Sequence, residues 1–431
     1  MIRLTVVSGR VNVCYNQDLI FLKLFSFMAA TPISSLFPLI EHCQQQRHVY
    51  LDSAATSQKP QQVIEAVGNF YRRDNANVHR AAYTLAVKAT GEYEHSRALC
   101  AAFLSAPRTE EVIFTSGTTE AFNLLANTLP YAGDGWQAGD EVILSQLEHH
   151  ANIVPWQIVA DKLGLVIRVI DVDPHGDLDL DHFQQLLNAN TRLVSVSHVS
   201  NTLGTVNPIE TICRLAHANG SLVAVDGAQA VAHCAVDVTK LDCDFYCFSG
   251  HKMYGPTGVG VLWGRYQLLD QLPPWQGGGE MIERVSFDHT SYNQLPFRLE
   301  AGTPNISGVI GLASAIAFIN QQDRGQIAEH EQRLMQSAKS QAAAIPGVRI
   351  IGQPQQQSSL FSFVVDDCHP SDIATLLDEQ GVFVRSGHHC CQPLMQHLGL
   401  EGTVRVSFAT YNNDDDVERF IVALTKACDL L

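Results

Sequence analysis

The sequence predicts an α/β protein whose mostly parallel sheet is covered by helices on both faces. Between about residues 110 and 265, short β-branched runs alternate with longer amphipathic stretches, which is the pattern of such a sheet. The chain has 431 residues, of which 46% are hydrophobic and 17% charged. This composition allows a large buried core and excludes a mainly disordered chain.

Seven runs in this region are expected to be strands of one sheet. They are Glu111–Ser116, Glu141–Gln146, Leu165–Asp171, Arg192–Val199, Leu222–Asp226, Asp244–Ser249 and Gly258–Trp263. Ligands of such sheets bind at the carboxyl ends of the strands. The residues that directly follow each run are therefore the candidates for function.

The first two strand ends carry hydroxyls and histidines. Gly117, Thr118 and Thr119 precede a helical pattern and form an anion cradle suited to a phosphate, although an ordinary helix cap is the alternative. His149 and His150 follow the second run. They do not have the His-Glu-x-x-His spacing of zinc enzymes, and no metal site is expected.

The later strand ends add an amide, a carboxylate and an amine. Asn201 follows the fourth run. Asp226 ends the fifth and Gln229 follows it, while Ser249 ends the sixth and His251 and Lys252 follow it. A lysine there is usually solvated, but in an apolar wall it can act as an amine nucleophile. A phosphate cradle, a flat ring, an aspartate and a lysine at one edge together predict a pyridoxal 5'-phosphate site.

A second cluster lies in the loop from Arg385 to Pro393, which carries two adjacent thiols, Cys390 and Cys391. Buried apolar cysteines are the alternative interpretation. The histidines and the arginine beside them favour a reactive thiolate. A zinc site is disfavoured because four adjacent residues cannot close a tetrahedron without strain.

The overall charge and the cysteine pattern indicate which binding partners and which cellular compartment to expect. The net charge is −16 and no basic run occurs, which disfavours nucleic-acid or anionic-membrane partners. The apolar stretch of residues 19–27 is too short for a membrane span. Eleven irregularly spaced cysteines fit a reducing cytoplasm.

From about residue 31 to 431 the chain resembles the pyridoxal phosphate-dependent cysteine desulfurases of the SufS/CsdA group, which include selenocysteine lyases. The segments that carry the resemblance are 50–56, 77–80, 148–156, 226–229, 248–260, 300–305 and 385–393. The resemblance implies a fold-type-I, aminotransferase-like architecture. It implies a large cofactor domain at 47–315 and a small α+β domain at 28–46 and 316–431. Residues 1–27 are expected to be an upstream extension, because Met28 and a helix-like entry follow the apolar stretch.

The resemblance also assigns a role to each matching residue. Lys252 matches the lysine that links to the cofactor, and Cys390 matches the nucleophile that carries the persulfide. The other cofactor contacts would be Asp226 at the ring nitrogen, Gln229 and Asn201 at the ring oxygen, His149 stacked on the ring, and Thr118, Thr119, Ser249 and His251 at the phosphate. The expected substrate-binding residues are Arg385 and Arg405 at the carboxylate, together with Asn201, His79 and Arg80.

The implied enzyme is a homodimer that converts L-cysteine into L-alanine and passes sulfur to a small SufE-like acceptor protein. His79, Arg80 and Thr303 would reach the neighbouring subunit's site, with Thr303 at the phosphate. Selenocysteine and cysteine sulfinate remain alternative substrates. A transaminase and a non-catalytic sulfur-assembly scaffold are further alternatives.

Two residues depart from the family pattern. Ser116 stands where the family usually has arginine, and Cys391 stands where it has alanine. The serine removes one cation near the cradle. The extra thiol is a second sulfur acceptor, a liability to oxidation or, as we favour, without a role, because a disulfide between adjacent cysteines is strained.

Overall fold

The seven predicted strands form a single sheet in the computed structural model, which describes residues 6–7, 10–11 and 32–431. In spatial order its strands are β4 (Val112–Thr115), β10 (Gly260–Gly264), β9 (Phe245–Ser249), β8 (Leu222–Asp226), β7 (Thr191–Ser197), β5 (Glu141–Ser145) and β6 (Val166–Ile170). Only β10 runs antiparallel to its neighbours in this sheet. The predicted fold class is confirmed.

Helices cover both faces of this sheet, and the alternation of side chains along a strand explains why both faces are apolar. Val223 and Val225 of β8 pack in one apolar cluster with Ile212, whereas Ala224 packs in another with Leu125 and Trp156. Ile212 lies on α8 (Ile209–Ala218), Leu125 on α5 (Thr118–Thr128) and Trp156 on α6 (Val154–Leu163). A strand buried on both faces must be apolar at successive positions, which explains the near-continuous runs.

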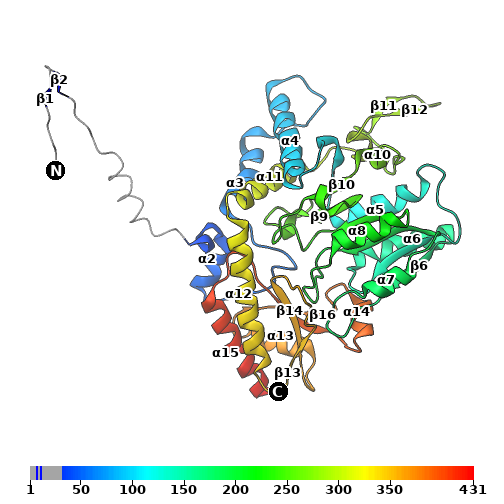
Figure 1. Ribbon diagram of the computed structural model, residues 1–431. Helices are drawn as coiled ribbons and strands as arrows, with labels where there is room; N and C mark the ends of the chain where they lie inside the picture. The colour runs from blue at the N-terminus through cyan, green and yellow to red at the C-terminus, as the bar shows by residue number, and fades with distance from the viewer. Residues whose placement is uncertain (1–5, 8–9, 12–31) are drawn as a thin grey trace.

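A second sheet is antiparallel and lies in the C-terminal part of the chain. Its strands, in order, are β13 (Val348–Ile351), β14 (Leu360–Val365), β17 (Thr403–Ser407) and β16 (Arg385–Gly387). It packs with α12 (Arg324–Ala343), α13 (Pro370–Asp378) and α15 (Asp414–Leu430). Figure 1 shows α12 and α15 side by side at this end of the molecule. A reciprocal cap between Asn413 and Asp416 fixes the start of α15.

The N-terminal part of the described chain joins the two halves. After α2 (Pro38–Gln45), β3 (Val49–Tyr50) pairs in parallel with β15 (Val382–Phe383), so residues 49–50 share a sheet with the C-terminal region. The domain boundaries given above stay a prediction. Residues 1–27 lie outside the described residues except for the short pair β1 (Val6–Val7) and β2 (Arg10–Val11).

The remaining α-helices and one hairpin lie around these sheets. They are α3 (Gln61–Asn69), α4 (Thr84–Phe103), α7 (Leu180–Leu186), α9 (Val238–Leu241), α10 (Tyr266–Leu269), β11 (Ile282–Val285), β12 (Thr290–Tyr292), α11 (Ile306–Asn320) and α14 (Gln392–His397). Within the described chain, none of the helices has the length and apolar character needed to cross a membrane.

Candidate active site

A cavity of about 200 Å³ lies at the carboxyl edge of the seven-stranded sheet. Most of the predicted site residues line it. They are Thr118, Thr119, His149, Asn201, Asp226, Gln229, Ser249, His251, Lys252, Arg385 and Arg405. Residues from five strand ends and from the C-terminal sheet therefore converge on one space.

The cradle at the start of α5 depends on a glycine. Gly117 has φ +153°, and a Cβ at this position would lie 3.2 Å from Ser249 Oγ. Ser249 Oγ accepts the backbone N–H of Thr118 at 2.9 Å and lies 2.8 Å from the Thr118 hydroxyl. Hydroxyls and backbone N–H groups at the start of a helix are suited to a phosphate.

Asp226 and Lys252 are two buried titratable groups of the cavity, and each influences the pKa of the other. Burial raises the pKa of Asp226, and Lys252 opposes that rise. Burial also lowers the pKa of Lys252 to about 8, with Asp226 opposing the fall. A neutral amine is therefore accessible near physiological pH, as a nucleophilic lysine requires.

His149 is a neutral ring in this cavity. Burial, together with the positive charge of Lys252, lowers its pKa to about 3. Its Nδ1 accepts the backbone N–H of Ala151 at 3.0 Å, so the ring proton is on Nε2. The residue before it, Glu148, is fixed by its buried carboxylate, which accepts Asn152 Nδ2 at 2.6 Å and Ser197 N at 3.0 Å.

The two arginines differ in how much of their hydrogen-bonding capacity is already used. Arg405 is buried, and its guanidinium donates to Asp52 Oδ1 at 2.9 Å and to the Asn201 carbonyl at 2.8 Å. Arg385 is half-buried, and its contact to a side chain is the Cys390 thiol, at 3.6 Å. Arg385 thus has more donors free for a substrate carboxylate than Arg405, of whose nitrogens only Nε lacks a partner in the described part of the chain.

Cys390 sits at the rim of this space in a constrained loop. His389 and Cys390 both have left-handed backbones, with φ +53° and +57°, which is costly for residues other than glycine. Hydrogen bonds hold this conformation: Asn201 Nδ2 donates to the His389 carbonyl at 2.6 Å, and His150 N donates to the Cys390 carbonyl at 2.8 Å. Neighbours Arg385 and His389 line the cavity, and the Cys390 side chain does not.

Cys391 points the other way. It is fully buried, and its thiol donates to the Glu148 carbonyl at 3.2 Å. Burial raises its pKa to about 12. The thiol therefore stays protonated at neutral pH and is a poor nucleophile.

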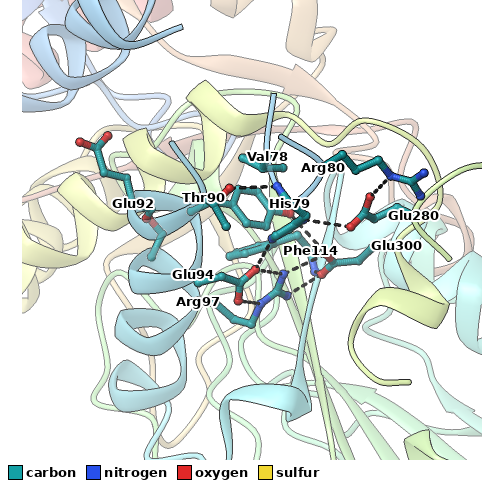
Figure 2. Close-up of polar contacts among 12 residues, drawn as sticks. Val78, His79, Arg80, Thr90, Glu92, Glu94, Arg97, Phe114, Glu280 and Glu300 are labelled. Atoms are coloured by element: carbon teal, nitrogen blue, oxygen red, sulfur yellow. Dashed lines mark hydrogen bonds and ion pairs between the residues drawn. The ribbon is translucent and has the colours of Figure 1, made fainter. Parts of the chain in front are cut away.

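His79, Arg80 and Thr303 lie outside this cavity. Figure 2 shows His79 between two carboxylates, with Glu94 and Glu280 each 3.0 Å from a ring nitrogen. Arg80 pairs with the same Glu280 at 2.9 Å, and Thr303 is exposed. His79 lines a second cavity, of about 170 Å³.

Figure 2 also shows what fixes this region. Arg97 is buried, with its guanidinium between Glu94 and Glu300, and its nearest Glu300 oxygen is 2.6 Å away. Glu300 also accepts the backbone N–H of Phe114, in β4, at 2.7 Å. The chain around residue 300 is thus anchored to α4 and β4.

Sequence reasoning missed the residues that support these groups. Asp52 neutralises Arg405, and Ala54 accepts Gln229 Nε2 at 2.7 Å through its carbonyl. Both lie in the matching segment 50–56, which was the available signal. Asn201 was expected at the ring and substrate, and its side-chain amide donates to the thiol loop while it also lines the cavity.

The cavity residues fit pyridoxal phosphate. In the described part of the chain, the Asp226 carboxylate accepts one hydrogen bond, from Ala228 N at 2.9 Å, which leaves an oxygen for a ring N–H. The Nε of Arg405 is buried without a partner there. The cradle of Thr118 and Ser249, which a Cβ at Gly117 would narrow, lines the same cavity as Asp226 and Arg405.

Comparison with known proteins agrees with this chemistry. Residues 49–420 match the aminotransferase class-V family. A probable cysteine desulfurase from Vibrio cholerae is 48% identical over 383 residues, covering 89% of this chain and 94% of the relative. A cysteine desulfurase from Escherichia coli is 46% identical with the same coverage.

Solved structures give the same result. The crystal structure of the cysteine desulfurase CsdA, in an S-sulfonic acid form, from Escherichia coli has a TM-score of 0.86 at 40% identity, covering 92% of this chain and 98% of that one. The apo cysteine desulfurase from Thermococcus onnurineus has a TM-score of 0.88 at 38% identity, covering 94% and 100%. The chain therefore belongs to the aminotransferase class-V family of pyridoxal phosphate enzymes and, within it, to the cysteine desulfurases.

Proposed function

We propose that this enzyme converts L-cysteine into L-alanine, takes the substrate sulfur onto Cys390 as a persulfide, and passes it to a small SufE-like acceptor protein. The observation that carries the proposal is the shared setting of three groups. Lys252 and Arg385 line one cavity, and the Cys390 thiol lies 3.6 Å from the Arg385 guanidinium at its rim.

The cavity residues divide into two sets around the cofactor. Asp226 and Gln229 would hold the ring, with His149 against it, and the cradle residues Thr118 and Ser249 would hold the phosphate, with Thr119 and His251 beside them. Bound pyridoxal phosphate withdraws electrons and makes the Cα proton of an attached amino acid acidic. Asn201 would stand between cofactor and substrate.

Lys252 has two tasks in this scheme. Its amine would hold the cofactor in the resting enzyme and, when free, would take the Cα proton of the substrate. Because burial lowers its pKa to about 8, the freed amine holds and releases a proton near neutral pH.

The arginines orient the substrate. A cysteine carboxylate would take the spare donors of Arg385, while Arg405, already bonded to Asp52, supplies a fixed positive charge beside it. This orientation turns the substrate sulfur toward the thiol loop.

Cys390 performs the sulfur transfer. Its thiolate attacks the substrate sulfur, so that a new S–S bond forms while the substrate C–S bond breaks. The electron pair of the broken bond stays on the carbon skeleton, which takes up protons and leaves as alanine. The sulfur is left on Cys390 as a persulfide, and an acceptor thiol then removes it.

A homodimer fits the surface beside His79. Large apolar side chains are exposed on α3, the helical turn 70–74 and the start of α4: Ile64 at 47%, Tyr71 at 61%, Tyr83 at 56%, Leu85 at 44% and Val87 at 59%. Apolar groups gathered in this way mark protein contacts. If a second copy of the chain covered these side chains, His79, Arg80 and Thr303 of each subunit would lie near the active site of the other.

The reducing cytoplasm suits this chemistry. The ten cysteines in the described part of the chain are all free, and a reducing compartment keeps a thiol such as Cys390 in the reduced form that can attack sulfur. The short loop around Cys390 limits the reach of the sulfur, so the acceptor must dock beside it.

The test is to treat the cofactor-loaded enzyme with L-cysteine, then measure alanine and search the Cys390 peptide for an added sulfur atom by mass spectrometry. Cys390→Ala should keep the cofactor and lose both products. Selenocysteine and cysteine sulfinate are run beside cysteine. Undiminished alanine from cysteine in Cys390→Ala would contradict the proposed sulfur transfer.

A further inference from the structure

Lys59 is a half-buried lysine that takes no part in the scheme above. It lies just before α3, and within the described residues no carboxylate comes within ion-pairing distance of it. Its ammonium donates instead to the carbonyls of Ser57 and His251, the latter at 3.0 Å, and to the Thr56 hydroxyl at 3.3 Å. Burial lowers its pKa to about 8.

The His251 carbonyl receives an unusual number of donors. Besides Lys59 Nζ, it accepts Thr56 Oγ1 at 3.0 Å, Ser57 N at 3.1 Å and Ser57 Oγ at 3.2 Å. A carbonyl oxygen has two lone pairs, so four donors crowd it. All four come from one short segment nearly two hundred positions earlier in the chain.

This carbonyl belongs to the peptide bond that joins His251 to Lys252. Both residues lie in the short helical turn 250–252 that follows β9. Fixing the plane of that peptide fixes the direction in which the Lys252 side chain leaves the backbone. The segment of residues 56–59 thus acts on the cofactor lysine without touching its amine.

A cation suits this task better than another hydroxyl. A hydrogen bond from an ammonium is about twice as strong as one between neutral groups. One ammonium can also donate to three oxygens, and here it joins the loop of residues 56–57 to the lysine turn. Without a carboxylate nearby, these oxygens are what offset its desolvation.

We propose that Lys59 is a positioning residue, which holds the His251 carbonyl and so aims Lys252 at the cofactor. The inference rests on the proposed role of Lys252. It concerns the rate at which the lysine joins the cofactor, whereas the affinity for the cofactor's ring and phosphate depends on other residues.

The experiment compares apoenzymes of the wild type, Lys59→Met, Lys59→Arg and Thr56→Val. Lys339→Met is the matched control, because Lys339 is also half-buried, bonds to Gln357 Oε1 at 2.6 Å, and does not line the cavity. Two probes are used. Pyridoxal 5'-phosphate forms the coloured link with lysine, and pyridoxine 5'-phosphate lacks the aldehyde and cannot.

We expect Lys59→Met to form the coloured link at least about tenfold more slowly and to bind pyridoxine 5'-phosphate as wild type does. Lys59→Arg should recover part of the rate, Thr56→Val should slow it less, and Lys339→Met should leave it unchanged. A wild-type rate in Lys59→Met overturns the inference. An equal loss for both probes also overturns it, because that result indicates a general structural role. If Lys59→Met does not fold, Thr56→Val is measured with the same two probes. A wild-type rate of the coloured link, or an equal loss for both probes, then overturns the inference.

Borohydride reduction of the loaded wild type followed by peptide mapping separates this outcome from failure of the proposed function. A label on a lysine other than Lys252 would remove the proposed role of Lys252. A label on Lys252 together with wild-type rates in the variants would remove only the inference about Lys59.

Discussion

At Lys252 the surroundings set the protonation state of a single amine. Its pKa of about 8 means that about a tenth of the amine is neutral at pH 7, and about half at pH 8. The rate of pyridoxal phosphate incorporation into the apoenzyme should therefore rise with pH through a midpoint near 8 and then level off. Stopped-flow absorbance measures it. A rate that climbs without a plateau to pH 10 would place the amine in ordinary solvent.

The two adjacent thiols should behave differently. The Cys391 thiol is buried with a pKa of about 12, so Cys391→Ala should retain alanine formation within about threefold. Cys390→Ser should lose it by about a hundredfold or more, because the hydroxyl cannot accept sulfur. Alanine release and persulfide mass report both. Equal losses in the two variants would give Cys391 a direct part in the transfer.

Among the helices and strands, the junction of β4 and α5 depends on Gly117. An alanine there must adopt φ +153° and bring its Cβ to 3.2 Å from Ser249 Oγ, so Gly117→Ala should cost about 1–3 kcal/mol and weaken cofactor binding. Gly220→Ala is the control, because Gly220 has φ +83° but open space around it. It should lower stability without changing the cofactor Kd. Equal cofactor Kd values for the two variants would contradict a role of the Gly117 cradle in cofactor binding.

The anchor between α4 and the chain at residue 300 is a buried ion pair. Arg97→Met would leave the Glu300 carboxylate without its cation, and such losses cost about 3–5 kcal/mol. Arg168→Met breaks a pair with Glu141 whose arginine is 48% exposed, so the loss of stability should be much smaller than in Arg97→Met. Urea unfolding gives both free energies. Similar values would mean that burial of Arg97 contributes nothing.

For the whole molecule, the exposed apolar side chains beside His79 predict association. Tyr71→Glu should produce monomers with little activity, because the proposed site needs residues from a second copy. Val422→Glu is the control, since Val422 is 49% exposed but lies on α15. Sedimentation velocity gives the state of each variant. An active Tyr71→Glu monomer would exclude a shared site.

The positions of the seven strands and of most cavity residues could be predicted because they follow from local patterns. Asp226 ends one buried run and Lys252 follows another, and parallel strands bring their carboxyl ends to one edge. The support of Arg405 by Asp52 could not be predicted in this way, since it joins positions 353 apart. The local pattern did not distinguish the two adjacent thiols, and only the family resemblance pointed to Cys390. In the structure, backbone angles at His389 and Cys390 decide which thiol faces the cavity rim.

The sequence alone determined the fold class, the family and the chemical types at the strand ends, because periodicity and short motifs are properties of neighbouring residues. Only the tertiary structure decided which groups are buried, which oxygens Lys59 and Arg405 contact, and that His79 and Arg80 lie outside the chain's own cavity. Burial and partner charge set the protonation of Lys252 and His149, and both depend on segments that meet only when the chain has folded.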